Sequence, residues 1–289
     1  MKLVVTGAGG QLGHDVVLHA ESLGDDVVGV DKAALDITDA VAVGALLSST
    51  RPDAVINAAA YTAVDACESN ESLAYAVNAD AVGHLSAACE LVGAHLVHVS
   101  TDYVFDGTLD RPYREDDPTN PQSVYGQSKL AGEIAAGPNA AIARTSWVCG
   151  EHGNNMVRLV LRLAANPDQA LAFVDDQRGH PTFTADLASA LRTLAADRRS
   201  GVYHVTNQSA VSWYEFVREI LAAGGHDPDR VRPISTAELD PPRPAPRPAN
   251  SVLENAAWRA AGYELLRDFR EPLAELVTRL DSHGGQTSV

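Results

Sequence analysis

Cysteine is scarce in this sequence, which has three among 289 residues. Cys67, Cys89 and Cys149 lie far apart, and no CxxC pair or Cys/His cluster occurs. Disulfide frameworks and structural zinc sites are read from such clusters, so we expect neither a disulfide nor a metal site. Few, unclustered cysteines are typical of a reducing compartment, and we expect a cytoplasmic protein.

Long hydrophobic runs are also missing. No apolar stretch reaches the roughly 20 residues that a membrane helix needs, so we expect no membrane span. The opening MKLVVTGAGG lacks the profile of a signal peptide. A hydrophobic content of 45% is nevertheless ample for the core of one large domain or two closely packed ones.

Basic residues are the third scarcity. The sequence has 22 Lys and Arg but 38 Asp and Glu. Its only lysines are Lys2, Lys32 and Lys129. A net charge of −16 opposes binding to nucleic acid or an anionic membrane, so we expect neither as a partner. The acids are spread along the chain, and this pattern favours a halophilic host, where salt screens their repulsion.

What the sequence does contain is an alternation of short apolar runs with helix-like segments. The runs predict strands at 2–6, 25–31, 53–60, 95–102 and 140–150. The segments between them predict helices at 11–24, 39–52, 72–93 and 124–137. This alternation is typical of βαβ units, and we expect an α/β fold with a Rossmann-type doubly wound parallel sheet.

The second half is less regular. It predicts helices at 155–167 and 212–225 and a strand at 202–207. The proline-rich run 240–250 then breaks the periodicity, which resumes after it. We therefore expect this run to cross a folded surface rather than to link separate domains.

A glycine turn follows the first predicted strand. Gly7, Gly10 and Gly13 lie in GAGGQLG, immediately before a predicted helix. Glycine permits a tight turn and a close approach to a pyrophosphate, and the helix N-terminus offers free N–H groups. In this strand–turn–helix context the motif predicts dinucleotide binding.

An acidic residue closes the second predicted strand. Asp31 could accept hydrogen bonds from the adenosine ribose and favour NAD, whereas the adjacent Lys32 would favour the 2′-phosphate of NADP. Asp36 is a further candidate near the adenine, or simply an acid at a helix N-terminus. NADPH and NADH both remain candidate cofactors.

Tyr125 and Lys129 form a YxxxK pair on one predicted helix. Residues four apart share a helix face, so both side chains can enter one cleft. We expect the ammonium to lower the pKa of the phenol toward the working pH, as general acid–base catalysis requires. Thr101, with Ser100 as the alternative, ends the preceding strand and could hydrogen-bond the substrate oxygen.

This hydroxyl–tyrosine–lysine set resembles that of the extended short-chain dehydrogenase/reductases. Within them the chain is similar to the dTDP-4-dehydrorhamnose reductase family. The matching blocks are GAGGQLG (7–13), RPDAVINAAAYTAVDACES (51–69), STDYVFDG (100–107), YGQSKLAGE (125–133), RTSWVCG (144–150), DDQRGHPT (175–182), GVYHVTN (201–207) and RPANSVL (247–253).

The resemblance implies a smaller mixed α/β substrate-binding domain beside the sheet. Residues 1–150 plus about 170–206 would bind NAD(P), while about 151–169 and 207–289 would mainly bind the nucleotide sugar. The cofactor residues implied, beyond those above, are Gln11, Leu12, Ile37, Ala59, Ala60, Tyr61 and Thr62. The substrate residues implied are Thr101, Asp102, Tyr103, Trp147, Arg247 and Asn250.

The implied substrate is a dTDP-4-dehydro-6-deoxy-L-sugar, whose C4 ketone would be reduced in the last step of dTDP-L-rhamnose synthesis. Some members of the family dimerise through a magnesium ion held by glutamates, but Asp15 stands at one such place, so no metal is predicted. Monomer and homodimer both remain open. The alternatives are another nucleotide-sugar 4-ketoreductase or epimerase, or a non-catalytic subunit resembling the methionine adenosyltransferase β subunit.

Overall fold

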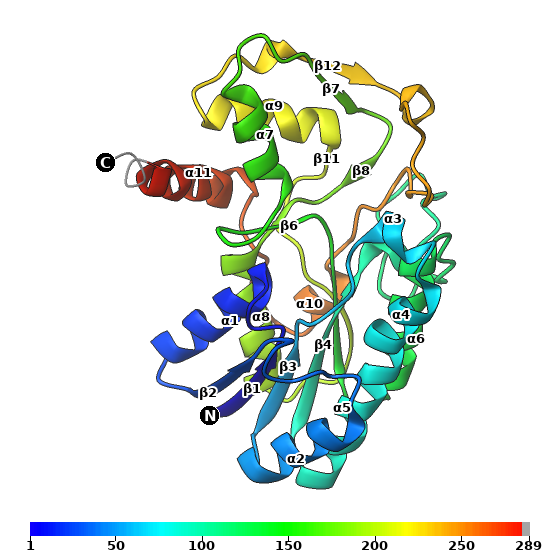
Figure 1. The fold of residues 1–289 in the computed structure, drawn as a ribbon, viewed down its shortest axis with the longest axis vertical. Coiled ribbons are helices and arrows are strands. Elements are labelled where there is room, and N and C mark those ends of the chain that lie inside the picture. Colours follow the sequence, from blue (N-terminus) through cyan, green and yellow to red (C-terminus); the bar gives the residue numbers. More distant parts are fainter. Residues whose placement is uncertain (285–289) are drawn as a thin grey trace.

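The fold is taken from a computed structural model, which describes residues 1–284. Its centre is a six-stranded sheet in the order β10-β5-β4-β3-β1-β2, with every neighbouring pair parallel (Figure 1). The strands are β1 (Lys2–Thr6), β2 (Asp26–Val30), β3 (Ala54–Asn57), β4 (His95–Thr101), β5 (Ala141–Thr145) and β10 (Gly201–His204). The predicted doubly wound α/β fold is confirmed.

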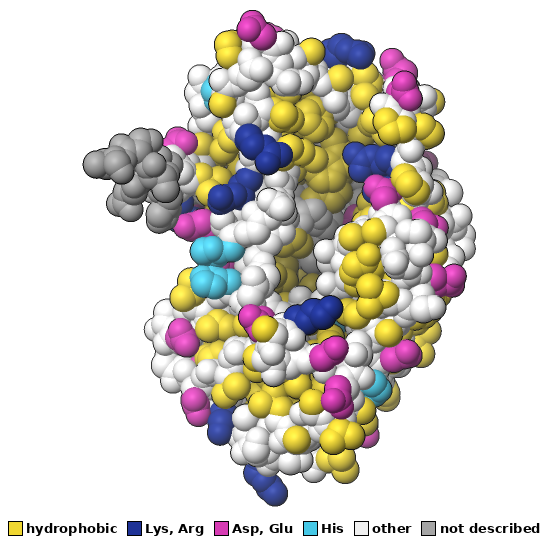
Figure 2. Space-filling view, viewed as in Figure 1, with side chains coloured by type: hydrophobic (Ala, Val, Ile, Leu, Met, Phe, Trp, Pro, Cys, Tyr) yellow, Lys and Arg dark blue, Asp and Glu magenta, His cyan; other side chains and the backbone are white. Residues whose placement is uncertain are grey.

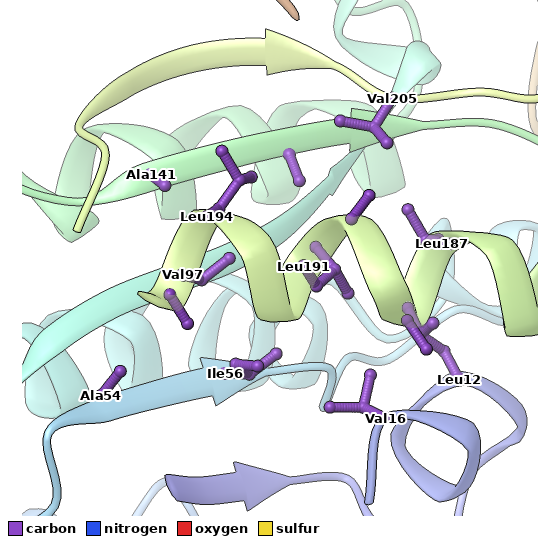
Figure 3. Packing of buried hydrophobic residues seen from close by; sticks show 14 of the residues in the cluster. Leu12, Val16, Ala54, Ile56, Val97, Ala141, Leu187, Leu191, Leu194 and Val205 are labelled. Carbon is purple, nitrogen blue, oxygen red and sulfur yellow. The ribbon is translucent and has the colours of Figure 1, made fainter. Parts of the chain in front are cut away.

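Side-chain alternation along β1 gives the sheet two separate hydrophobic faces. Leu3 and Val5 pack into one cluster with α1 (Gln11–Ser22), α8 (Thr184–Ala196) and Trp258 of α10 (Ala256–Ala260). Figure 3 shows Leu187, Leu191 and Leu194 of α8 lying across the strands in this cluster. Val4 faces the opposite cluster, which includes side chains of α2 (Ala40–Thr50) and α5 (Ala81–Val92).

A third hydrophobic cluster lies beyond the sheet. It joins α7 (Met156–Ala164), α9 (Trp213–Ala223) and α11 (Arg270–Gly284), which Figure 1 shows gathered in the upper part of the molecule. Short strands complete this part in three pairs. These are β7 (Leu171–Val174) with β12 (Val231–Ile234), β8 (Arg178–Gly179) with β11 (Val211–Ser212), and β6 (Val148–Cys149) with β9 (Thr182–Phe183).

The remaining helical segments include a long run that leads into β4. A continuous helical run consists of α4 (Glu71–Tyr75), a π-helical turn (Ala76–Asp80) and α5. The other helical segments are α3 (Val64–Cys67), α6 (Val124–Ala136) and single 3₁₀ turns at Asp102–Val104, Pro228–Arg230 and Thr236–Glu238. Within residues 1–284, no helix has both the length and the apolar character needed to cross a membrane.

The strand order reverses beside β1. The chain passes from β1 to β2 on one side and returns through α2 to β3 on the other side of β1. In open parallel sheets, ligands bind beyond the carboxyl ends of the strands at such a reversal. The glycine turn after β1 and the loop after β3 therefore flank the expected binding crevice.

Candidate active site

The glycine turn between β1 and α1 is built so closely that side chains cannot be added. Gly7 has φ +73°, and a Cβ there would lie 2.7 Å from the backbone nitrogen of Ala59. A Cβ on Gly13 would lie 2.1 Å from the carbonyl oxygen of Gly7. The N-cap Gly10 supplies no side-chain hydrogen bond to α1, so the first backbone N–H groups of the helix have no capping side chain. This cradle fits a dinucleotide pyrophosphate.

A hollow of about 550 Å³ opens on one side of the turn. Asp31 lies in its wall, where its Oδ1 accepts hydrogen bonds from the backbone N–H groups of Ala33 and Ala34, both at 3.0 Å. Lys32 also lines the hollow, so both signals seen in the sequence face the same space. The predicted cofactor residues in this wall are Gly7, Gly10, Asp31, Asp36, Ile37, Ala59, Ala60 and Tyr61.

A second hollow of about 460 Å³ shares Gly10, Ala58 and Ala60 with the first. Figure 2 shows a recess lined largely by hydrophobic side chains between the lower part of the molecule, which holds the sheet, and the upper part. The predicted residues in the wall of this second hollow are Gln11, Leu12, Gly13, Thr62, Thr101, Asp102, Tyr103, Tyr125, Lys129 and Trp147.

The N-terminus of α6 places Tyr125 beside Thr101. Ser123 caps the helix by accepting a hydrogen bond from the N–H of Gly126, 3.2 Å away. Gly126 permits close packing, because a Cβ there would lie 2.2 Å from the carbonyl oxygen of Tyr103. The Tyr125 ring meets the Tyr103 ring edge to face with centroids 5.4 Å apart, and its hydroxyl hydrogen-bonds with Thr101. The predicted hydroxyl–phenol pair is thus present.

The expected lowering of the Tyr125 pKa is wrong for this structure. Burial raises the pKa of Tyr125 above its usual value, and the hydrogen bond with Thr101 opposes that rise only in part. The amine of Lys129 instead donates to the carbonyl oxygen of Val99 at 2.7 Å. Burial also lowers the pKa of Lys129 to about 8, with the charge of Glu133 acting in the opposite direction. For Lys129, desolvation therefore outweighs the attraction of Glu133 for the ammonium.

Asp102 continues the series of hydrogen bonds that begins with Tyr125 and Thr101. Its side chain is buried, and its Oδ1 accepts a hydrogen bond from the Thr101 hydroxyl at 2.9 Å. Burial raises the pKa of Asp102 to about 6, although its hydrogen bonds work against the shift. When Asp102 is ionised, the Thr101 hydrogen points toward it, and the Thr101 oxygen is left to accept.

Ser100, the alternative hydroxyl, has another partner although it also lies in the wall of the second hollow. Its hydroxyl donates to Glu133 Oε1 at 2.5 Å. Glu133 is in turn held by a buried ion pair with Arg144 at 2.7 Å. This geometry favours Thr101 as the hydroxyl that works with Tyr125.

Two tryptophans form an aromatic wall of the second hollow. Trp147 has φ +47°, and its ring stacks on Trp213 with centroids 3.6 Å apart and an interplanar angle of 10°. Gly179 leaves room for this wall, since a Cβ there would lie 2.7 Å from the Trp147 ring. Trp213 was not anticipated. The only local sequence signal was an aromatic residue after Ser212, which begins a capping box with Glu215.

Asn78 is a second unanticipated residue, in the π-helical turn that precedes α5. Its amide oxygen accepts from the N–H of Tyr61 at 2.8 Å, and its amide nitrogen donates to the Tyr61 carbonyl at 3.1 Å and to Ser128 at 3.0 Å. Asn78 thus holds the loop after β3 against α6. Single π-helical turns are rare and recur at functional sites, but nothing in the local sequence marked this one.

Arg247 and Asn250 do not line either hollow. Asn250 binds a loop, because its amide nitrogen donates to the carbonyls of Leu109 at 2.8 Å and Arg111 at 2.9 Å. Arg247 forms an ion pair with Asp65 and hydrogen-bonds with Tyr103. Arg247 therefore reaches the second hollow through Tyr103, whereas Asn250 supports a neighbouring loop.

In the described part of the chain, no group of three or more His, Cys, Asp and Glu side chains is arranged to hold a metal ion. Asp15, which stands where some relatives were expected to hold magnesium, accepts a hydrogen bond from the hydroxyl of Thr184 on α8.

Comparison with known proteins gives full-length matches. The family model described as the RmlD substrate binding domain matches residues 1–282. A dTDP-4-dehydrorhamnose reductase from Mycobacterium tuberculosis is 47% identical over 100% of this chain and 95% of the relative. A dTDP-4-keto-6-deoxy-D-glucose reductase from Streptomyces niveus is 38% identical over 96% of this chain and 97% of the relative.

A solved structure resembles the fold equally well. The dTDP-4-dehydrorhamnose reductase of Bacillus anthracis, solved in complex with NADP, superposes with a TM-score of 0.90 at 34% identity. The match covers 98% of this chain and 99% of that one. This structure shares the fold over its whole length, including the part beyond the sheet.

Proposed function

We infer the activity from one premise, which is that the chain belongs to the RmlD substrate binding domain family. The chain is an NAD(P)H-dependent oxidoreductase, a dTDP-4-dehydrorhamnose reductase that reduces the C4 ketone of dTDP-4-dehydro-β-L-rhamnose to dTDP-L-rhamnose. The observation that carries this inference is the joint presence of Thr101, Tyr125 and Lys129 in one hollow that shares walls with the glycine cradle.

The chemistry divides between the cofactor and the chain. The reduced nicotinamide would supply the hydride, and the residues would manage the charge that develops on the carbonyl oxygen. Tyr125 donates the proton, and its raised pKa keeps the phenol protonated at neutral pH. Thr101 holds the Tyr125 hydroxyl in place, and Lys129 contributes positive charge below its pKa of about 8.

The wall of the second hollow supplies the sugar contacts. Trp147, supported by Trp213, would pack on the apolar face of the deoxyhexose. Asp102 and Tyr103 would meet its polar groups, and Arg247 would act by orienting Tyr103. We assign Asn250 an indirect role, because its amide holds the loop at Leu109 and Arg111.

Several broader properties belong to the same proposal. The sheet with α8 would form the NAD(P)-binding domain, and the part built around α7, α9 and α11 would bind the nucleotide sugar. Since Asp31 and Lys32 face the same hollow, both NADPH and NADH would be used. We further propose a cytoplasmic monomer or homodimer from a halophilic host, on the strength of the unclustered cysteines and the net charge of −16.

The direct test is a spectrophotometric assay. Purified protein is mixed with the 4-keto-rhamnose nucleotide and NADPH or NADH, in low and in multimolar salt, and the oxidation of the cofactor is followed. Stoichiometric oxidation with formation of dTDP-L-rhamnose supports the proposal. Absence of oxidation with both cofactors at every salt concentration contradicts it.

A second candidate is reduction of a different 4-keto nucleotide sugar, which the 38% identity to the Streptomyces niveus reductase favours. The same assay with dTDP-4-keto-6-deoxy-D-glucose separates the two by kcat/KM. An epimerase would convert its substrate without net consumption of cofactor. A regulatory subunit would bind a methionine adenosyltransferase and show no reductase activity with either sugar.

A further inference from the structure

A series of contacts between buried polar side chains crosses from β1 to β4 of the sheet and ends at Lys129. Thr6 on β1 donates to Asn57 Oδ1 at 2.7 Å, and Asn57 Nδ2 lies 3.0 Å from His98 Nδ1 on β4. His98 Nε2 lies 3.4 Å from the Lys129 amine nitrogen. Thr6, Asn57 and His98 are each 0% exposed, so these side chains are shielded from bulk water and bond to one another.

The orientation of the Asn57 amide is fixed by the backbone N–H of Ala59, which can only donate a hydrogen bond. The backbone N–H of Ala59 donates to Asn57 Oδ1 at 3.1 Å, and a backbone N–H cannot accept. The atom there must therefore be the amide oxygen. It follows that the amide nitrogen, a donor, is the atom that faces His98.

This orientation fixes the tautomer of His98. Because Asn57 Nδ2 donates, His98 Nδ1 must accept and cannot carry a hydrogen. Burial, followed by the neighbouring Lys129, holds the pKa of His98 well below its usual value, so the ring is neutral. A neutral imidazole without hydrogen on Nδ1 carries it on Nε2, the nitrogen that faces Lys129.

We propose that His98 is a positioning residue for Lys129. The Nε2–H of His98 faces the amine nitrogen of Lys129 and favours the neutral amine over the ammonium. An ammonium has three donors and no acceptor, so it would face a second donor across 3.4 Å. A neutral amine instead accepts from His98 Nε2–H while donating to the carbonyl of Val99 at 2.7 Å. This inference rests on the proposed function only for the role of Lys129 in catalysis.

Other charged and titratable groups near Lys129 also act on the protonation of its amine, but they do not cancel the effect of His98. On α6, Glu133 acts on Lys129 through its charge, and Tyr125 lines the same hollow as Lys129. Asp102, which follows β4, lines that hollow too. Glu133 is ion-paired with Arg144 of β5, which reduces its attraction for the ammonium. Asn57 and Thr6, from β3 and β1, carry no charge.

A functional consequence follows for Lys129. Its amine changes charge within the pH range of ordinary assays, in keeping with a pKa lowered by burial to about 8. Below that pKa the ammonium helps to stabilise negative charge on the substrate oxygen. We therefore expect kcat/KM to fall as the pH rises through it.

Nuclear magnetic resonance of the native chain tests the tautomer without any activity measurement. In ¹⁵N-histidine-labelled protein, the His98 ring is identified by its absence in His98→Phe. The expected spectrum shows hydrogen on Nε2 and a bare Nδ1 at pH 7. Hydrogen on Nδ1, or a doubly protonated ring, overturns the proposal even if the reductase assignment holds.

The coupling to Lys129 is tested with Asn57→Asp, a change of nearly equal size that reverses the hydrogen bond. The carboxylate accepts from His98 Nδ1–H, which frees Nε2 to accept from the ammonium. The pKa of Lys129 is read by ¹³C titration of labelled lysine, a simple spectrum because the chain has three lysines. We expect an increase of roughly 1–3 units.

The added negative charge alone would also raise this pKa, so the same substitution is repeated in the His98→Phe chain. We expect a clearly smaller increase there, since only the charge effect remains. Equal increases in both chains overturn the proposal. If these variants fail to fold, the tautomer measured in the native chain still decides it.

Discussion

At the scale of single residues, the site is governed by burial more than by attraction between charges. Tyr125 is 8% exposed and Lys129 is 2% exposed. Each group is therefore pushed toward its neutral form, which raises the pKa of the phenol and lowers that of the amine. The result is a proton donor that stays protonated at neutral pH beside an amine that titrates near it.

Asp102 gives a residue-scale prediction with a defined sign. Burial raises its pKa from 3.8 to about 6, so the folded chain binds the proton more tightly than the unfolded chain. The contribution of Asp102 to stability is therefore greatest below about pH 4 and is lost as the pH rises through about 6. We expect Asp102→Asn to resemble the native chain at pH 4 and to be more stable at pH 8, by at most about 3 kcal/mol.

Urea unfolding at both pH values measures this difference, with Asp106→Asn as the control. Hydrogen bonds from Asn120 and then Tyr113 lower the pKa of Asp106, so its removal should destabilise the chain at pH 8 rather than stabilise it. Equal stability of Asp102→Asn and the native chain at pH 8 would refute a desolvated Asp102.

Residue identities in the site were predictable where a motif carries the chemistry. The glycine turn, Tyr125 and Lys129 follow from motif spacing within the strand–helix alternation, whereas the sequence offered Thr101 with Ser100 as its alternative. The pKa direction of Tyr125 did not follow, because it depends on how much water the folded chain excludes. The roles of Trp213 and Asn78 were not predictable either, because their partners Trp147 and Ser128 lie far away in the sequence.

At the scale of elements, the functional groups are placed by the ends of helices and strands. The N-cap Ser123 and the close approach of Gly126 bring Tyr125 against the end of β4. In the same way, Ser212 begins α9 and aims Trp213 at Trp147. The aromatic wall thus combines Trp147, which follows β5, with Trp213 of α9, a helix that lies beyond the sheet.

Trp213 supplies the element-scale prediction. Replacing it with Leu removes the stacked partner of Trp147, and aromatic pairs contribute about 1 kcal/mol beyond buried area. We expect the KM for the sugar nucleotide to rise by roughly fivefold to tenfold with little change in kcat or in the KM for NADPH. Steady-state kinetics with each substrate varied in turn measures this.

Trp258→Phe is the matched control, because Trp258 packs in the core against the sheet and lies in neither hollow. It should leave both KM values unchanged. A Trp213→Leu chain with native KM for the sugar nucleotide would rule out the aromatic wall.

Elements were predictable in proportion to their periodicity. The strands of the first half were located by their apolar runs, and α6, α7 and α9 by helical spacing. Short strands such as β8 and β11 have two residues each, too few to carry a pattern. Helix α8 was not singled out from the sequence, although Leu187, Leu191 and Leu194 cover one face of the sheet.

At the scale of the whole molecule, the net charge of −16 sets the response to salt. Repulsion between like charges opposes the compact state, and the Debye length falls from about 10 Å at 0.1 M to about 3 Å at 1 M salt. Fold class was predictable at this scale because it follows from the alternation of strand and helix signals along the chain, which does not depend on the exact bounds of any one element.

Salt therefore provides the whole-molecule prediction. We expect the midpoint of thermal unfolding to rise as KCl increases from 0.1 M to 2 M, because screening weakens the repulsion among surface acids. Calorimetry measures the midpoint, and a chain with ten exposed Asp and Glu replaced by Asn and Gln is the control. A midpoint that falls with KCl, or rises equally in the control, would argue against surface repulsion as the cause.

The central claim is that Tyr125 gives its proton to the substrate oxygen inside the hollow that it shares with Thr101 and Lys129. Its most direct test measures turnover and cofactor binding side by side in Tyr125→Phe. The account predicts a loss of roughly 10²–10⁴-fold in kcat with an unchanged Kd for NADPH, since the ring is kept and only the acid is removed. Turnover within a few-fold of the native chain would contradict it.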